Sequence, residues 1–292
     1  MKYTIKDFNK QFPNDAACLE YIYKQRFPEG ATCEKCGVKD HFYPVVVKNV
    51  TRRSYACQCG FQLYPTEGTI YHKSPTPLKT WFFAMFLMTS SKNGVSAMEL
   101  HRQIGVTYKC AWRINHQIRQ LMKEDGLTVE GIVEADETYI GGRRKGNHHK
   151  GGAGKTPVIG VLERGGPVIA TVAKDVTMYT LVPYVKDKVL GGSTLMTDEL
   201  RAYNAVPKNH VTHYSVKHSA KEYVKGMCHT NSLEGFWSQL KRSINGTFHS
   251  VSRKHLQKYV NEFSYRYNRR KTGTPMFLHL VADVAAQHGS AV

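Results

Sequence analysis

The sequence predicts an α/β domain in its second half, preceded by a small cysteine-rich segment and by a group of helices. Four cysteines fall in two close pairs between residues 33 and 59, two short helical patterns precede residue 122, and strand patterns alternate with helical ones from about residue 128. A chain of 292 residues suits two or three compact units. We expect domains at 1–75, 76–126 and 127–272, followed by a C-terminal tail at 273–292.

The charge of the chain is strongly positive. It has 41 Lys and Arg against 23 Asp and Glu, a net charge of +18. This excludes an acidic or charge-balanced metabolic enzyme as the default and favours a polyanionic partner, nucleic acid before anionic membrane. The longest apolar run, Trp81–Met88, is too short to cross a bilayer, and the N-terminus lacks the apolar segment of a secretory signal. We therefore expect a cytoplasmic, nucleoid-associated protein without a membrane partner.

The two cysteine pairs predict a structural zinc site. They are spaced C-x2-C and C-x-C, and a glycine follows each pair. Four thiolates close a tetrahedral Zn²⁺ site with no open position for water, so this segment stabilises and binds but does no chemistry. A redox C-x-x-C motif is the alternative. The four ligands of one Zn²⁺ ion would be Cys33, Cys36, Cys57 and Cys59, whereas Cys18, Cys110 and Cys228 suit buried free thiols.

A helix-turn-helix pattern follows the zinc ribbon. An apolar helix is expected over 78–90, then a capping box from Ser96 to Glu99 opens a helix over 97–103. A turn at Gly105 leads to a second helix over 107–122, which we expect to expose Lys109, Arg113, His116 and Arg119. In a DNA complex Lys109 and Arg113 would lie nearest the bases or phosphates. The alternative is an ordinary helical hairpin in a basic protein.

The second half of the chain predicts a mixed sheet covered by helices. Strands are expected over 129–140, 156–162, 167–173, 193–198 and 211–217, and helices over 176–190, 232–244 and 254–269. This order matches the ribonuclease-H-like layout.

Three acidic residues in this half are candidate metal ligands. Asp136 lies within an apolar strand, Asp198 ends another strand, and Glu234 lies in the first turn of a helix. Carboxylates from strand, strand and helix suit two Mg²⁺ (or Mn²⁺) ions that act on a phosphodiester. Each acid also has a structural alternative: Asp136 could pair with an arginine, Asp198 could cap a helix, and Glu234 could complete a capping box with Asn231. Their neighbours Glu134, Glu137 and Glu199 are set aside, and Glu134 is the easiest to mistake for Asp136 because it shares its strand face.

Three motifs carry a family resemblance: VEADETYIGG (133–142), MTDELRAY (196–203) and HTNSLEGFWSQLKR (229–242). With the cysteine pairs, they resemble the ISXO2-like transposases of bacterial insertion sequences. The resemblance implies a DDE-type recombinase that hydrolyses DNA at the ends of the element and then joins the freed 3′-hydroxyl to target DNA. It places the first two metal ligands at Asp136 and Asp198, and the third at Glu234 or Asn231. The resemblance also implies that no nucleotide cofactor is needed. Residues 151–156 (GGAGKT) agree, because they lack the spacing and context of a phosphate-binding loop.

Basic residues around these acids are expected to bind double-stranded DNA, both the element's ends and its target. They are Arg143, Arg144 and Lys145 in a glycine-rich loop, Lys241 and Arg242 on the helix of Glu234, and Arg266 on the last long helix. Because two DNA ends must be joined, a homodimer or higher oligomer is expected. Two rival functions stay open: a zinc-ribbon DNA-binding regulator without catalysis, and a nuclease of the same fold that does not transpose.

Overall fold

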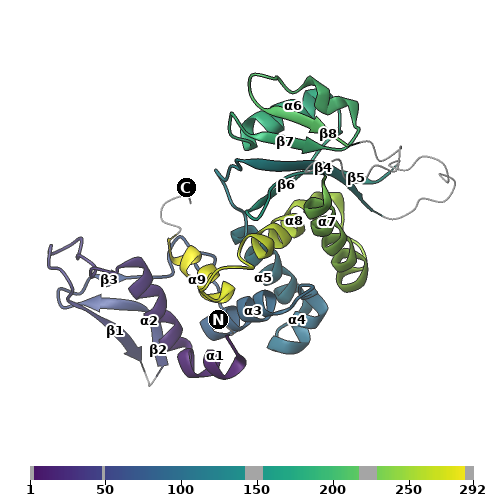
Figure 1. Cartoon of the computed structure of the whole chain (residues 1–292). Helices are drawn as coiled ribbons and strands as arrows, with labels where there is room; N and C mark the ends of the chain where they lie inside the picture. The colour runs from purple at the N-terminus through teal and green to yellow at the C-terminus, as the bar shows by residue number, and fades with distance from the viewer. Residues whose placement is uncertain (1–2, 48–49, 142–153, 217–228, 287–292) are drawn as a thin grey trace. The chain divides into compact units, whose positions relative to one another are not determined.

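The computed structural model describes residues 3–47, 50–141, 154–216 and 229–286 (Figure 1). The chain forms two compact units, one of Met1–Leu121 with Thr272–Val292 and the other of Met122–Lys271. Within the described residues, no helix combines the length and the apolar character needed to cross a membrane.

The first unit begins with two helices and a small antiparallel sheet. Helices α1 (Ile5–Gln11) and α2 (Asp15–Arg26) precede strands β1 (Phe42–Val47), β2 (Val50–Cys57) and β3 (Gln62–Leu63), which lie in the order β1-β2-β3. Tyr23 of α2 stacks on Tyr55 of β2 with ring centroids 4.3 Å apart. The two strands expected between the cysteine pairs are present, and a third short strand completes the sheet.

Four further helices complete this unit: α3 (Leu78–Ser90), α4 (Ala97–Ile104), α5 (Tyr108–Leu121) and α9 (Met276–Ala286). The residues expected to form a C-terminal tail therefore contain a helix. Phe277 of α9 packs against Phe12 and Phe86, with ring centroids 5.8 and 6.0 Å away. The domain boundary expected at residue 75 falls inside this compact unit, which runs to Leu121. The division of the first half into separate domains at 75 and 126 stays a prediction.

The turn between α4 and α5 follows the sequence pattern closely. Ser96 Oγ accepts a hydrogen bond from Glu99 N at 3.1 Å, and Thr107 Oγ1 accepts one from Cys110 N at 3.3 Å. Gly105 ends α4 with φ of +68°, a left-handed conformation that glycine adopts without strain. Both helices therefore begin and end within about one residue of the expected positions.

The second unit is a five-stranded mixed sheet with helices on both faces. Its strands are β4 (Ile132–Ile140), β5 (Thr156–Glu163), β6 (Val168–Val172), β7 (Thr194–Thr197) and β8 (Thr212–Ser215), in the order β6-β5-β4-β7-β8. Pairings among β6, β5 and β4 are antiparallel, whereas β4, β7 and β8 are parallel. The predicted α/β class with a mixed sheet is confirmed.

Helix α6 (Met178–Lys188) and the short helix η1 (Arg201–Ala205) cover one face of this sheet. Helix α7 (Asn231–Ser243), its π-helical extension η3 (Ile244–Phe248) and helix α8 (Arg253–Asn268) cover the other (Figure 1). Alternate residues of β4 face opposite layers, so Val133 and Ala135 join the core under α6 while Ile140 joins the core under α7 and α8.

Amide side chains of α8 cover the edge strand β6. Asn268 accepts a hydrogen bond from Val168 N and donates one to Val168 O, at 2.7 and 3.0 Å. Gln257 likewise accepts from Val172 N at 2.7 Å and donates to Ala170 O at 3.3 Å. These contacts satisfy backbone groups that an edge strand otherwise offers to another chain.

Candidate active site and zinc centre

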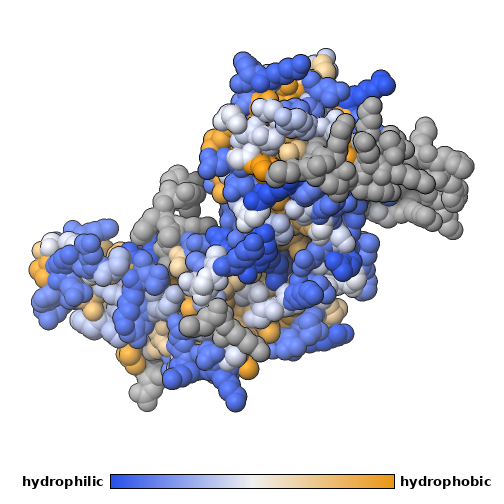
Figure 2. Space-filling view, viewed as in Figure 1, coloured by the Kyte–Doolittle hydropathy of each residue, from blue (hydrophilic) through white to orange (hydrophobic). Residues whose placement is uncertain are grey.

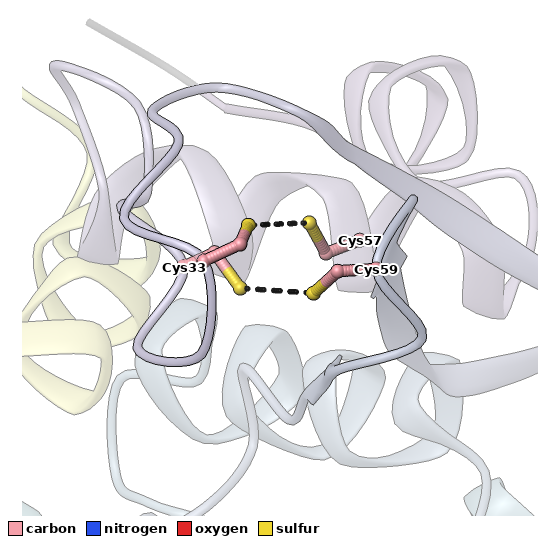
Figure 3. Close-up of side chains that lie close together, drawn as sticks. Cys33, Cys57 and Cys59 are labelled. Carbon is pink, nitrogen blue, oxygen red and sulfur yellow. Dashed lines mark hydrogen bonds between the residues drawn. The ribbon is translucent and has the colours of Figure 1, made fainter.

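The four predicted zinc ligands meet at one point in the first unit. Sγ of Cys33 lies 3.5 Å from Sγ of Cys59, and Sγ of Cys36 lies 3.6 Å from Sγ of Cys57. Figure 3 shows the thiols of Cys33, Cys57 and Cys59 pointing toward one another across the gap between the two cysteine pairs. A Zn–S distance of about 2.3 Å puts tetrahedral sulfurs roughly 3.8 Å apart, whereas a disulfide needs about 2.05 Å. The donor set therefore fits Zn²⁺.

Two glycines shape the turns that carry these thiols. Gly37 and Gly60 have φ of +71° and +84°, and their N–H groups bond back to Cys33 O and Cys57 O at 2.8 and 2.9 Å. A residue with a Cβ atom is strained in this left-handed region, so each turn depends on its glycine. Outside the centre, Cys18 is a buried free thiol as predicted and Cys110 is half-buried, whereas Cys228 lies outside the described residues.

Carboxylate oxygens of Asp136, Glu137 and Asp198 lie within 4.8 Å of one another in the second unit. The sheet register explains why the two aspartates meet. Strands β4 and β7 run parallel with Ala135 opposite Thr197. The residues that follow these two, Asp136 and Asp198, therefore lie at the same level of the sheet. Sequence reasoning named both aspartates but set Glu137 aside as a mere neighbour of Asp136.

Burial and like charge weaken the acidity of this cluster. Burial first, and then the charge of Asp198, raise the pKa of Asp136 to about 7, and the charge of Glu234 adds to this effect. Burial and the charges of Asp198 and Asp136 likewise raise the pKa of Glu137 to about 7. A divalent cation relieves this repulsion, and hard carboxylate oxygens are the ligands that Mg²⁺ prefers. The residues present therefore fit a divalent metal ion.

Glu234 lies near this group but outside it. Its carboxylate is exposed on the first turn of α7 and accepts a hydrogen bond from Thr230 Oγ1 at 3.0 Å. The structural alternative for Glu234, a capping box with Asn231, is not formed: Thr230 is the N-cap residue, Asn231 is the first helical residue, and the N-cap makes no side-chain capping bond. Asn231 is exposed.

A different acid caps α7. Glu134 of β4 is fully buried and accepts hydrogen bonds from the backbone N–H groups of Ser232 and Leu233 at 2.9 and 3.0 Å. It also pairs with Arg164 at 2.8 Å. Sequence reasoning set Glu134 aside. The one feature of the sequence that could have drawn attention to it is that it shares a strand face with Asp136.

The basic residues proposed for DNA differ in their placement. Lys109, Lys241 and Arg242 are exposed. Arg113 is half-buried and its guanidinium lies 5.6 Å from the ring centroid of Trp81. Arg143, Arg144 and Lys145 lie outside the described residues.

Three basic side chains differ from the expectation that they face solvent. Arg266 is 9% exposed and pairs with fully buried Glu262 at 2.9 Å, so it belongs to a buried ion pair and does not lie on the surface as expected. Arg119 is 1% exposed and donates to Val95 O at 3.4 Å, and His116 is also buried. The predicted exposure of Arg119 and His116 on α5 is therefore wrong, because that face of the helix packs on its own unit.

Known protein families match both regions of the chain that carry these sites. The ISXO2-like transposase domain matches residues 128–268, and the transposase zinc-ribbon domain matches residues 13–61. An uncharacterized protein in transposable element ISH50 of Halobacterium salinarum is 26% identical over 278 residues, covering 88% of this chain and 92% of that protein. An uncharacterized transposase-like protein of Haemophilus influenzae is 27% identical over 101 residues, covering 35% of this chain and 80% of its own length.

A solved structure of the simian T-cell lymphotropic virus intasome with PP2A regulatory subunit B56 gamma aligns with 63% of this chain and 64% of its own. The sequence identity is 13% and the TM-score 0.28, too low to support an argument.

The two domain matches, on a four-cysteine ribbon and on a mixed α/β domain with an acidic cluster, define a protein of the transposase class. The chain belongs to the ISXO2-like transposases of insertion sequences, with their N-terminal zinc ribbon.

Proposed function

We propose that this chain is an active DDE-type transposase. It cleaves DNA at the ends of its insertion sequence and joins the freed 3′-hydroxyl to target DNA. The observation that carries the proposal is the proximity of Asp136 and Asp198, which two adjacent parallel strands bring together in a cluster of partly buried, mutually repelling carboxylates. A chain of net charge +18 can hold a polyanion beside these acids.

Asp136 and Asp198 would hold two Mg²⁺ or Mn²⁺ ions together with a third ligand. Family resemblance favours Glu234, or Asn231 one turn away from it, whereas proximity favours Glu137. When bound, the ions would activate the attacking water or hydroxyl and stabilise the leaving oxygen of the phosphodiester. The chain's own residues would orient the scissile phosphate and hold the acids in place, and the hydrogen bond from Trp237 favours the ionised form of Asp136.

The rest of the chain would bind DNA. We propose that the mixed sheet is a ribonuclease-H-like domain and that α4 and α5 form a helix-turn-helix, in which exposed Lys109 contacts DNA. Lys241 and Arg242 on α7 are exposed and would contact phosphates near the acids. The four thiolates would bind one structural Zn²⁺. A dimer or higher oligomer would bring two ends of the element together.

Strand transfer in vitro tests the proposal. Purified full-length protein is mixed with Mg²⁺ or Mn²⁺, target plasmid, and linear DNA that carries the sequences flanking its own coding region. Wild type should give cleaved ends and joined products, and Asp136→Asn and Asp198→Asn should each give neither. Cleavage without joining would favour a nuclease of the same fold, and DNA binding with no metal-dependent cleavage would favour a regulator.

The same assay identifies the third ligand. If Glu234 is the ligand, Glu234→Gln should abolish cleavage as completely as Asp136→Asn while Glu137→Gln keeps measurable activity. The reverse order would assign the third position to Glu137. Activity retained in both variants would point to Asn231, which Asn231→Ala tests.

A further inference from the structure

We propose that Glu134 is a positioning residue. It fastens the first turn of α7 to strand β4 and thereby fixes where Glu234 and Trp237 lie relative to Asp136. The effect on catalysis rests on the proposed function, whereas the effect on geometry does not.

Glu134 contacts three segments near the start of α7. Its Oε2 accepts the backbone N–H groups of Ser232 and Leu233 at 2.9 and 3.0 Å. Its Oε1 accepts Nε of Arg164 at 2.8 Å, from the turn between β5 and β6. Nδ1 of His229 lies 3.3 Å from the same oxygen. Arg164 Nη2 in turn donates to His229 O at 2.8 Å, so the segment leading into α7 is held as well.

The N-cap residue of α7 does not supply this cap. The first N–H groups of a helix need acceptors, and these usually come from the side chain of the N-cap residue. Thr230 occupies the N-cap of α7 but makes no side-chain capping bond, and its hydroxyl donates to Glu234 instead. A carboxylate about 98 residues earlier in the chain replaces it, and its negative charge suits the positive end of the helix.

The capped turn leads directly to the candidate active site. Glu234 follows Leu233, whose N–H is capped, and Trp237 lies one turn further along the same helix. Trp237 Nε1 donates to Asp136 Oδ2 at 3.1 Å, and Asp136 is two residues from Glu134 on the same strand. Strand and helix are therefore tied twice, once at Glu134 and once at Asp136. Loss of the first tie should let α7 shift, which would displace Glu234 and weaken the second tie.

The experiment follows the Trp237 indole by NMR in the metal-free, full-length chain. Tryptophan is labelled with ¹⁵N, and Trp237→Phe assigns the resonance among the three tryptophans. The test variant is Glu134→Gln. The matched control is Glu262→Gln, because Glu262 is equally buried and also pairs with an arginine, but lies within α8. Both variants lose one buried ion pair in the same unit.

We expect Glu134→Gln to shift the Trp237 indole resonance and to speed its hydrogen exchange by about tenfold or more, while Glu262→Gln leaves both near wild type. Equal changes in both variants, in proportion to their loss of thermal stability, would overturn the proposal because they indicate a merely structural role. If Glu134→Gln does not fold, Arg164→Lys keeps the charge but loses the two-point contact, and it should give the same shift in weaker form. An unchanged indole signal in that variant would also overturn the proposal.

Metal binding and activity separate this proposal from the proposed function. Glu134→Gln should weaken Mn²⁺ binding and DNA cleavage by about 10–100-fold, and Glu262→Gln by much less. If wild type binds no metal and cleaves no DNA but the indole still shifts, the proposed function fails and the positioning role stands. If wild type is active and Glu134→Gln matches Glu262→Gln in every readout, the positioning role fails and the proposed function stands.

Discussion

The indole Nε1 of Trp237 donates a hydrogen bond to Oδ2 of Asp136 at 3.1 Å. The two residues are 101 positions apart, one on α7 and the other on β4. The donor partly offsets the burial and repulsion that raise the pKa of Asp136. A single contact therefore links the packing of a helix to the protonation of the first candidate metal ligand.

Replacement of Trp237 by phenylalanine should raise the pKa of Asp136 further, because the donor that favours the ionised form is lost. Protons would then compete better with metal, so Mn²⁺ binding should shift to higher pH. Calorimetric titration of Mn²⁺ between pH 6 and 8.5 measures this shift. Trp112→Phe on α5 is the control, since Trp112 is 38% exposed and lies in the first unit. An unchanged pH dependence in Trp237→Phe would contradict the expectation.

A methyl group added at Gly160 should destabilise the second unit. A Cβ atom there would lie 2.8 Å from both Cζ2 and Cη2 of Trp237, and such overpacking typically costs about 1–3 kcal/mol. Gly235→Ala is the matched control, because its Cβ would meet nothing within 4 Å and alanine favours a helix by about 0.5–1 kcal/mol. Urea denaturation of both variants should show opposite signs. Equal stability would mean that the Trp237 ring relaxes freely.

The stability of the metal-free chain should fall as pH rises from about 4 to about 7. Asp136 and Glu137 have folded-state pKa values of about 7, above the ordinary 3.8 and 4.5, so the folded state binds more protons across this range. Each proton bound in excess lowers the free energy of unfolding by about 1.4 kcal/mol per pH unit. Asp136→Asn cannot ionise, so its slope should be shallower and it should melt higher than wild type at pH 8 without metal. Thermal melts in a chelator test this, and added Mg²⁺ should stabilise wild type more than the variant.

The wild-type chain should bind one zinc ion, and removal of any one of the four cysteine thiolates should release it. Cys57→Ser should abolish stoichiometric zinc measured by elemental analysis, and the ribbon should then lose protection in hydrogen exchange because its fold depends on the metal. Cys110→Ser is the control, since Cys110 lies outside the cluster of four thiols. Full zinc content in Cys57→Ser would contradict a four-thiolate site.

Lys241→Ala should weaken DNA binding with a reduced dependence on salt. Lys241 is exposed on α7, the helix that also carries Glu234, and each lost phosphate contact lowers the slope of log affinity against log salt by about 1. Lys186→Ala on α6 is the control, because this exposed lysine lies on the helix that covers the opposite face of the sheet. Fluorescence anisotropy at several salt concentrations should separate the two variants. Equal losses in both would indicate nonspecific electrostatics alone.

Figure 2 shows hydrophilic residues over most of the visible face, with apolar residues in small separate groups. This pattern agrees with a chain whose apolar residues enter the cores of its two units. The sequence predicted much of these cores, because the period-two and helical patterns of apolar residues reflect which side chains are buried and which face solvent. The five strands, the covering helices and the paired thiols could be predicted from local pattern and spacing. The meeting of Asp136 with Asp198 followed from the expected sheet, in which their two strands are adjacent.

Local pattern could not decide which side chains pair across the fold. Glu134 and Glu137 looked like neighbours of the important acid, yet one caps a helix about 98 residues later and the other joins the carboxylate cluster. Arg266 and Arg119 looked like surface cations, yet both are buried. The first turn of α7 is likewise capped by Glu134 and not by a local capping box at Asn231.

The sequence by itself determined which segments form helices and strands and which four cysteines meet, because hydrophobic periodicity and cysteine spacing are local patterns of a few residues. Tertiary structure decided the partners of the buried charges. A buried charge is costly until an opposite charge or a donor reaches it, and that partner comes from wherever the folded chain passes.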